Sequence, residues 1–167
     1  MPTTRTICAA LIVSMALAGT ACNRRAPKSG ITSIQARIDG LTCPTCVPPL
    51  KASLTRQYQK SAIEVDDDKD TASVAFADND KFSVAEFRDA VERVRMRVVT
   101  MRVQACGTVE ASNGEKWLKA GDNRFLVRSE RALPVNAPLC LDGTLDSGST
   151  PATFQVSAFS VQGTSGS

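Results

Sequence analysis

Two kinds of apolar spacing alternate along residues 31–105, and their order limits the fold more than any other feature of the chain. Apolar residues two positions apart are typical of half-buried strands, and apolar residues three and four positions apart are typical of helices with one buried face. Helical spacing occurs in two segments, at 47–58 and 84–94. Strand spacing occurs at 34–38, 63–65, 72–76 and 99–105. The predicted order is therefore strand, helix, strand, strand, helix, strand.

Start signals support both helices. Pro48 and Pro49 lie in the first turn of the first one, where a missing backbone N–H costs little. Ser83 and Glu86 have the spacing of a capping box at the start of the second. Two helices on one face of a four-stranded antiparallel sheet form the split βαβ plan. We therefore expect an α+β fold in which residues 31–105 form a ferredoxin-like βαββαβ domain.

The chain changes character at Cys106. From there to residue 162, no long stretch keeps helical spacing, and Asn113-Gly114 is a tight hairpin signal. Short apolar runs that could form strands begin at Cys106 and occur at 117–118, 125–127, 139–141 and 154–161. About five short strands in such a segment suggest a small barrel. We expect residues 106–162 to form a small all-β, OB-like barrel and residues 163–167 to form a disordered tail.

Residues 1–21 are typical of a secretory signal peptide. Arg5 supplies a positive charge, and the apolar run at 7–18 is shorter than the roughly 20 residues that a membrane-spanning helix needs. The segment ends in small residues before Cys22, which resembles a bacterial lipoprotein cleavage box. Gly19 stands where such boxes usually have leucine, so plain cleavage after Ala21 is the alternative.

Lipidation of Cys22 would attach the chain to a membrane by its amino terminus. Residues 22–30 are charged and contain Pro27 and Gly30, and they would serve as a tether. Asn23, in place of aspartate, favours the outer over the inner membrane of a Gram-negative envelope. We expect an exported periplasmic or cell-envelope lipoprotein.

The charge balance and the absence of histidine exclude several classes of function. The chain has 20 basic and 17 acidic residues, and loss of the signal peptide removes only Arg5, which leaves a net charge of +2. So small a charge predicts no nucleic-acid partner. Histidine is the commonest general base, and none occurs in the sequence. No nucleophile–base pattern is visible either, so we do not expect an enzyme.

Four cysteines remain once Cys8 leaves with the signal peptide and Cys22 is lipidated. An exported protein meets an oxidising compartment, where disulfides form, and four cysteines allow three pairings. The first and fourth strands of an OB-like barrel are neighbours, which favours a disulfide between Cys106 and Cys140. Such a bridge would stabilise the barrel by about 3–4 kcal/mol on the chain-entropy model. A second thiol site and unpaired cysteines are the alternatives.

Cys43 and Cys46 lie between a predicted strand and a predicted helix. The positive end of a helix stabilises thiolates, and Pro44 stiffens the loop between them. Soft thiolates select Cu(I), other soft ions or zinc. Two sulfurs cannot complete the tetrahedral shell of a structural zinc site. The pair therefore predicts a low-coordinate site for a soft ion, completed by a partner's ligands where more are needed.

The segment from Gly40 to Cys46, with the apolar positions Val47, Leu50 and Leu54, resembles the heavy-metal-associated domain family. This family includes copper chaperones, the metal-binding modules of copper ATPases and the periplasmic mercury-binding protein. Its signature is Gly-Met-Thr-Cys-x-x-Cys, and Leu41 replaces the methionine here. The stretches 70–76 and 90–92 are similar to the third strand and second helix of the family. The resemblance covers residues 31–105 and implies binding of Cu(I), with Hg(II) and Zn(II) as alternatives.

The family often places glycine and an aromatic residue after its second helix, beside the metal. Arg95 and Met96 occupy the matching positions in this chain. Arg95 would add positive charge near the thiolates. Met96 is a candidate third soft ligand through its thioether, and packing over the loop is the alternative.

We therefore expect an envelope protein that takes a soft metal ion from a donor protein, or passes it to an acceptor protein, by exchange of thiolate ligands. Cys-x-x-Cys at a helix start is also used in thiol–disulfide exchange. Leu41 and Thr42 precede Cys43, where thioredoxin-like enzymes carry an aromatic residue. A redox module, a structural disulfide and a degenerate domain that serves only protein interaction are the alternatives.

Overall fold

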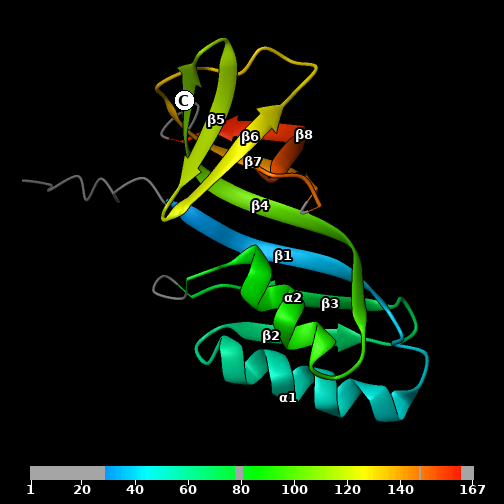
Figure 1. Ribbon diagram of the computed structural model, residues 1–167. Coiled ribbons are helices and arrows are strands. Elements are labelled where there is room, and N and C mark those ends of the chain that lie inside the picture. Colours follow the sequence, from blue (N-terminus) through cyan, green and yellow to red (C-terminus); the bar gives the residue numbers. More distant parts are fainter. Residues whose placement is uncertain (1–28, 78–80, 147, 163–167) are drawn as a thin grey trace, which may run out of the picture.

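The computed structural model describes residues 29–77, 81–146 and 148–162 (Figure 1). Along the chain, the elements of the first half are β1 (Gly30–Asp39), the short 3-10 helix η1 (Pro44–Cys46), α1 (Val47–Gln57), β2 (Ala62–Asp66), β3 (Thr71–Ala75) and α2 (Val84–Glu92). They are followed by β4 (Arg97–Ser112), β5 (Glu115–Ala120), β6 (Asn123–Arg128), β7 (Pro138–Asp146) and β8 (Thr153–Val161).

The expected fold class, α+β with a ferredoxin-like βαββαβ domain, is wrong. The described residues are 51% strand and 18% helix, with two α-helices and a closed barrel of five strands. One continuous sheet contains every strand, in the order β2-β3-β1-β4-β5-β6-β8-β7. The strands of the first half therefore continue the sheet of a mostly β structure.

The long strand β4 is the physical reason for this correction. It is 16 residues long, continues past the expected end at Ala105 to Ser112, and pairs with β1, β5 and β7. Gly107 lies within this strand. A Cβ at this position would overlap the backbone of Lys119 in β5, so the glycine allows two strands to approach closely. The strand therefore belongs both to the sheet beneath the helices and to the barrel (Figure 1).

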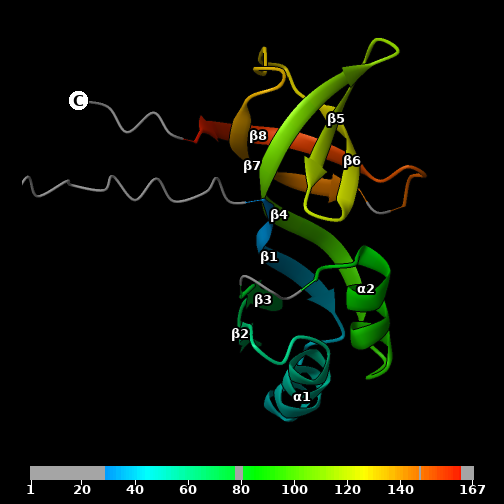
Figure 2. The ribbon, with the colours of Figure 1, turned by 90° about the vertical axis from the view of Figure 1, so that its left-hand side faces the viewer.

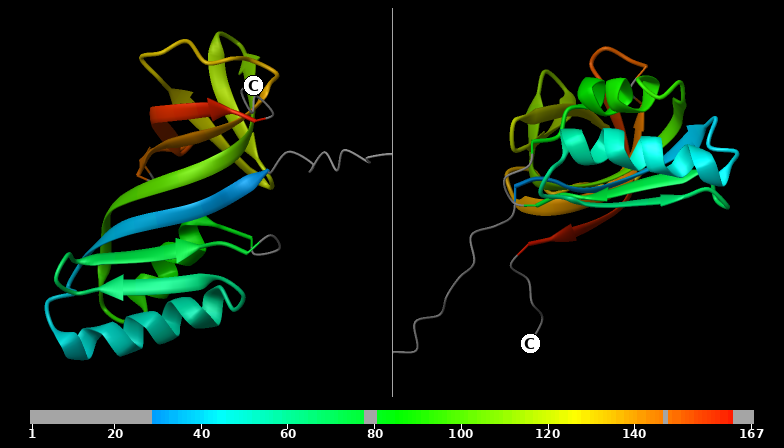
Figure 3. Two further views of the ribbon diagram at one scale, coloured as in Figure 1. Left: turned by 180° about the vertical axis from the view of Figure 1, so that it is seen from behind. Right: turned by 90° about the horizontal axis from the view of Figure 1, so that it is seen from below.

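The individual helices and strands of the first half do lie where their apolar spacing predicts. Both helices cover the same face of the strands (Figure 3, right). Leu50 and Leu54 of α1 and Phe87 of α2 are fully buried in one core with alternate residues of the strands. The two helices are also joined by a hydrogen bond of 2.6 Å from the Ser53 hydroxyl to the carbonyl oxygen of Ala90.

The second helix begins as predicted. Ser83 has extended backbone dihedrals at the N-cap of α2, and its hydroxyl accepts a hydrogen bond of 3.4 Å from the backbone N–H of Glu86. The first helix has no side-chain cap and carries proline in its first turn. The N–H of Val47 donates to the carbonyl oxygen of Pro44 in η1, and Pro48 and Pro49 have no N–H, so residues 47–49 leave no free donor at the start of α1.

The small barrel expected in the second half is present, and it is closed. Its strands follow the order β4-β5-β6-β8-β7, and β7 closes it by pairing with β4 (Figure 2). The β6–β8 pair is parallel and the other pairs are antiparallel. Asn113 and Gly114 both have positive φ between β4 and β5, as the tight hairpin requires. The barrel core contains Val109, Leu118, Phe125, Leu139, Leu141 and Phe154.

Several predictions concern residues that the structure does not describe. The signal peptide at 1–21, the lipidated Cys22, nearly all of the tether at 22–30 and the tail at 163–167 lie outside the described residues. Within the described ranges, no helix is long and apolar enough to span a bilayer.

Candidate functional site

The Cys43–Cys46 loop connects the end of β1 to the start of α1. The turn begins at Gly40, whose φ of 95° favours glycine. Cys43 is extended at the N-cap of η1, and Cys46 ends η1 and is the N-cap of α1. The backbone N–H of Cys46 donates to the carbonyl oxygen of Cys43 at 2.8 Å. This short turn of helix brings both cysteine side chains to the same side of the loop.

The two cysteines form a disulfide, with their Cα atoms 5.3 Å apart. Both residues are half-buried, so solvent reaches the loop. The Thr45 hydroxyl lies 3.2 Å from Sγ of Cys43. Because a disulfide sulfur carries no hydrogen, the hydroxyl is the donor. The same hydroxyl would donate to a thiolate after reduction of the disulfide.

The loop rests on the apolar core. Leu41 and Leu50 are fully buried, and Cys46 packs against the same core. Met96 is 7% exposed and lies beside the turn, since a Cβ on Gly40 would be 3.5 Å from Cγ of Met96. This position fits the packing role that we considered for Met96. Its role as a third soft ligand remains a prediction.

Two arginines, Arg95 and Arg97, lie next to the residues at the base of the loop. Arg95 is exposed in the turn between α2 and β4, with a φ of 62°. Arg97 forms an ion pair of 2.8 Å with Asp39, the last residue of β1. Neither η1 nor α1 has an acidic residue in its first turn. The carboxylate nearest to the loop along the chain is therefore matched by a guanidinium.

Sequence reasoning missed the Arg97–Asp39 pair. The two residues are opposite each other in the β1–β4 register. The sheet was expected to be antiparallel, but the apolar spacing does not show which of its strands are neighbours. The opposite charges of Asp39 and Arg97 are visible in the sequence, but only the register of the two strands shows that these residues lie opposite each other.

The described residues contain no group of three or more His, Cys, Asp and Glu side chains that could hold a metal ion. Cys43 and Cys46 therefore offer two sulfur donors and no further ligand of these four types nearby. This donor set fits a soft ion of low coordination number after reduction of the disulfide. A closed four-ligand zinc site would need donors from another molecule.

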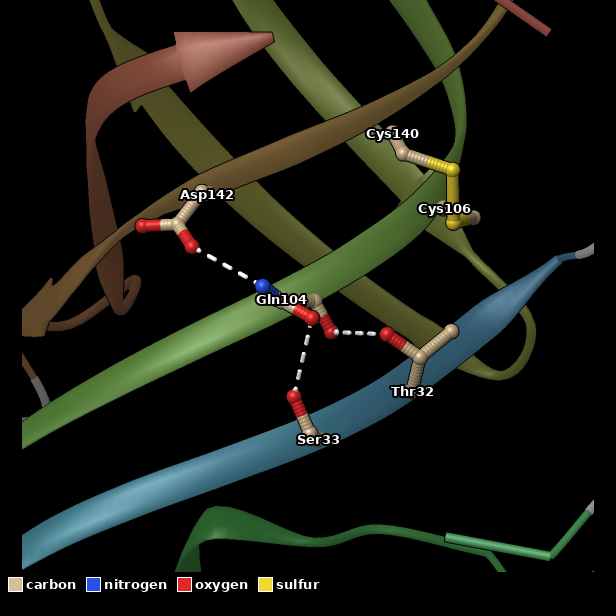
Figure 4. Close-up of a disulfide and its surroundings, with 6 residues drawn as sticks. All are labelled: Thr32, Ser33, Gln104, Cys106, Cys140 and Asp142. Atoms are coloured by element: carbon tan, nitrogen blue, oxygen red, sulfur yellow. Dashed lines mark hydrogen bonds between the residues drawn. A yellow bond between two sulfur atoms is a disulfide. The ribbon is translucent and has the colours of Figure 1, made fainter. Parts of the chain in front are cut away.

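Cys106 and Cys140, for which we favoured a disulfide, are bonded to each other (Figure 4). They face each other in the β4–β7 register, with Cα atoms 4.0 Å apart, and Cys106 is 4% exposed. This bond lies at the far end of β1 from the other disulfide, because Cys106 pairs with Gly30 and the cysteine loop follows Asp39. A strand of that length spans about 30 Å, so the two disulfides cannot exchange within one chain.

Comparison of the chain with protein-family models, with curated proteins and with solved structures found no match. The resemblance to the heavy-metal-associated domain family therefore depends on the cysteine loop and the apolar positions beside it. The arguments about function that follow start from the geometry of this loop.

Proposed function

We propose that the chain, with Cys43 and Cys46 reduced, binds one soft thiophilic metal ion and passes it to or from a partner protein. The observation that supports this most directly is the position of both sulfurs on one solvent-accessible loop at the start of a helix. The ion is the cargo of the protein. Cu(I) fits this donor set best, and Hg(II) and Zn(II) are alternatives.

The surroundings of the loop favour the thiolate form, which is the form that binds metal. Cys46 is the N-cap of α1 and lies at the positive end of the helix dipole. Thr45 can donate a hydrogen bond to Cys43. Arg95 adds a positive charge, and Asp39 is neutralised by Arg97. The helix dipole and the Thr45 hydroxyl would stabilise negative sulfur, and the two arginines reduce the negative charge at the base of the loop.

Ligand exchange explains how the ion would be transferred. Two protein sulfurs leave room in the coordination shell for a partner's thiolate. The partner's sulfurs would replace Cys43 and Cys46 one after the other, so that the ion is never released to water. The half-buried sulfurs are accessible enough for this exchange, and the buried core beneath them holds the loop in place.

Reduction of the Cys43–Cys46 bond is a condition of this function. A dithiol reductant would supply two electrons, form its own disulfide and leave two thiols on the chain. Binding of the ion then releases the thiol protons. The oxidation state of this loop would therefore determine whether the protein can accept metal.

The proposed function is tested by competitive Cu(I) titration of the reduced chain. The background variant Cys8→Ser with Cys22→Ser leaves four cysteines, which can be counted as free thiols before and after mild reduction. We expect about one ion per chain, and loss of tight binding in Cys43→Ser with Cys46→Ser. Binding that is equally tight without these two cysteines would refute the proposal. Met96→Leu, measured in the same way, separates a third ligand from a packing residue.

The observed disulfide also supports a second candidate function, thiol–disulfide exchange. A half-exposed Cys-x-x-Cys disulfide at a helix start is the reactive form of such a module. Measurement of the reduction potential and an insulin-reduction assay distinguish the two functions. An exchanger should reduce insulin with catalytic turnover, and a metal carrier should not.

The location of the protein is part of the same proposal. Export through residues 1–21 and lipidation of Cys22 would place the cysteine loop in the cell envelope, on a tether of residues 22–30. Metabolic labelling with a radioactive fatty acid should mark the wild-type chain and leave Cys22→Ala unmarked. Equal labelling of both chains would exclude Cys22 as the attachment point.

A further inference from the structure

A polar hollow lies where the sheet beneath the helices meets the barrel, far from the cysteine loop. Its volume is about 320 Å³, and its lining includes polar residues from β1, β3, β4 and β7. The intervening residues Ile34, Val74 and Val103 are buried beneath the helices. The polar side chains therefore point to the opposite face of the sheet. They are Ser33, Gln35, Ser73, Arg102, Gln104 and Asp142.

Two β-bulges border this hollow. In β1 the register skips Thr32, whose hydroxyl donates to the carbonyl oxygen of Gln104 at 3.2 Å. In β8 the register skips Ser157, whose hydroxyl donates to the carbonyl oxygen of Asp142 at 3.0 Å and lies 3.3 Å from its carboxylate. Bulges occur often beside functional sites, where they redirect side chains. Here the hydroxyls of Thr32 and Ser157 hold the strands that carry Gln104 and Asp142, the central side chains of the hollow.

The Gln104 amide is held at both ends. Its Nε2 donates to Oδ2 of Asp142 at 3.1 Å, and its Oε1 accepts from the Ser33 hydroxyl at 3.1 Å (Figure 4). These two bonds fix which end of the amide is nitrogen and which is oxygen. The floor of the hollow therefore has a defined hydrogen-bonding pattern.

Asp142 also orients Arg102. The Arg102 Nε donates to Oδ1 of Asp142 at 3.0 Å. Burial raises the pKa of Asp142, but the hydrogen bonds from Gln104, Arg102 and Ser157 outweigh this effect and lower the pKa below its ordinary value. The Asp142 side chain is 25% exposed and that of Arg102 is 63% exposed. The carboxylate therefore anchors the inner side of the guanidinium and leaves its outer side in solvent.

The solvent-facing side of the Arg102 guanidinium is oriented to donate hydrogen bonds to a ligand. The terminal nitrogens of Arg102 make no hydrogen bond or ion pair with any side chain or backbone group in the described ranges. Arginine with two free parallel N–H groups matches the two oxygens of a carboxylate. The Asp142 charge offsets that of Arg102, so a ligand with one negative charge fits the hollow better than a dianion.

We propose that this hollow is a binding site for a carboxylate group, received by the terminal nitrogens of Arg102, with Ser33, Gln35 and Ser73 as neutral hydrogen-bonding neighbours. A small organic acid and the free carboxyl end of a peptide both carry this group. The site is independent of the cysteine loop and of the metal-transfer function.

The test follows the backbone amide signals of the 15N-labelled chain by NMR during three titrations. The probes are propionate, acetyl-Gly-Gly with a free carboxyl end, and the same peptide with an amidated end. We expect saturable shifts at the hollow's residues with one or both acids and none with the amidated peptide. Binding of propionate alone identifies a small acid as the ligand, and binding of the free peptide alone identifies a carboxyl terminus.

Arg102→Gln should weaken binding at least about tenfold, because it removes a charge-assisted hydrogen bond. Arg37→Gln is the matched control. Arg37 is exposed on β1 and pairs with Thr100 in β4, two residues from Arg102, but it does not line the hollow. Its replacement should leave binding within about twofold. Gln35→Ala, which leaves the Arg102–Asp142 pair intact, is a second variant and should weaken binding by less than Arg102→Gln.

Three results would overturn the proposal. The first is the absence of saturable shifts with both acids. The second is equal loss of binding in Arg37→Gln and Arg102→Gln, which would indicate general attraction of anions to this face. The third is binding of the amidated peptide as tight as that of the free acid.

Discussion

Gly107 in β4 lies directly against the backbone of Lys119 in β5. A Cβ on Gly107 would overlap the carbonyl oxygen of Lys119 and lie 2.9 Å from its carbonyl carbon. Because both groups are backbone within paired strands, neither can move aside without disturbing the barrel. This contact is the place where β4 passes from the sheet beneath the helices into the barrel.

We predict that Gly107→Ala lowers the free energy of unfolding by about 3 kcal/mol or more, through backbone overlap in a packed core. Urea unfolding with the disulfides intact would measure the loss. Gly148→Ala is the matched control, because its nearest neighbour is the end of the Asp146 side chain at 3.4 Å. A change below about 0.5 kcal/mol is expected for the control. Equal effects of the two substitutions would contradict the role given to Gly107.

Ser83→Ala should destabilise the chain by about 1 kcal/mol, because it leaves the N–H of Glu86 without its side-chain acceptor. The loss would be measured by thermal or urea unfolding. Ser160→Ala provides the comparison, since Ser160 is exposed on β8 and makes no side-chain hydrogen bond with a described residue. A larger effect at Ser160 than at Ser83 would show that the cap contributes nothing.

The two disulfides should differ in how readily they are reduced. Both Cys43 and Cys46 are half-buried, whereas the other disulfide joins Cys106, which is 4% exposed between packed strands, to the half-buried Cys140. A mild dithiol reductant should therefore open the Cys43–Cys46 bond first, because exchange needs access to a sulfur. Alkylation of the freed thiols, followed by mass spectrometry of the peptides, gives the order directly. Release of Cys106 and Cys140 before the other pair would contradict this expectation.

Loss of the second disulfide should also cost far more stability. Replacement of Cys106 and Cys140 by alanine opens a loop with a sequence separation of 34 residues, which the chain-entropy model values at about 3–4 kcal/mol. The Cys43–Cys46 bond closes a loop with a separation of only 3 residues. Its loss should lower the free energy of unfolding much less. Urea unfolding of the two double variants compares them, and a similar loss in both would argue against the entropic explanation.

The stability of the chain should depend on Asp142 at low pH. Its pKa in the folded chain lies below the ordinary value of 3.8, so the carboxylate contributes stability that is fully present above that value. This contribution is lost as the pH falls through the lowered folded pKa. Between neutral pH and pH 2, the wild type should therefore lose more stability than Asp142→Asn. Parallel pH profiles of the two chains would show that Asp142 has no such role.

Local signals predicted the positions of the helices and strands, but not the class of the fold. The capping box at Ser83 and the hairpin at Asn113-Gly114 depend on neighbouring residues, and both are present in the structure. The fold class depended on where β4 ends. From the sequence, the strand is expected to end at Ala105, two residues before Gly107, because the chain changes character at Cys106. Only the neighbouring strand shows that the glycine serves close packing.

The cysteine loop and the polar hollow also differ in how far the sequence predicts them. The cysteine loop was found because the two cysteines, the prolines and the helical spacing are close in the sequence. The polar hollow was missed because four strands and two bulges build it. One sign of a bulge is the spacing of Ile31 and Ile34. Residues on one face of a regular strand are two positions apart, whereas these two buried residues are three apart. This break in strand alternation marks the bulge at Thr32.

The shared strand β4 also leaves no flexible joint between the barrel and the segment that carries the cysteines. Because one hydrogen-bonded strand enters both parts, the cysteine loop is held at a fixed distance and angle from the barrel surface. A partner that binds the barrel would therefore contact the sulfurs in one orientation only. The fixed distance between the barrel and the cysteine loop can therefore select partners whose own contact surfaces have the same spacing.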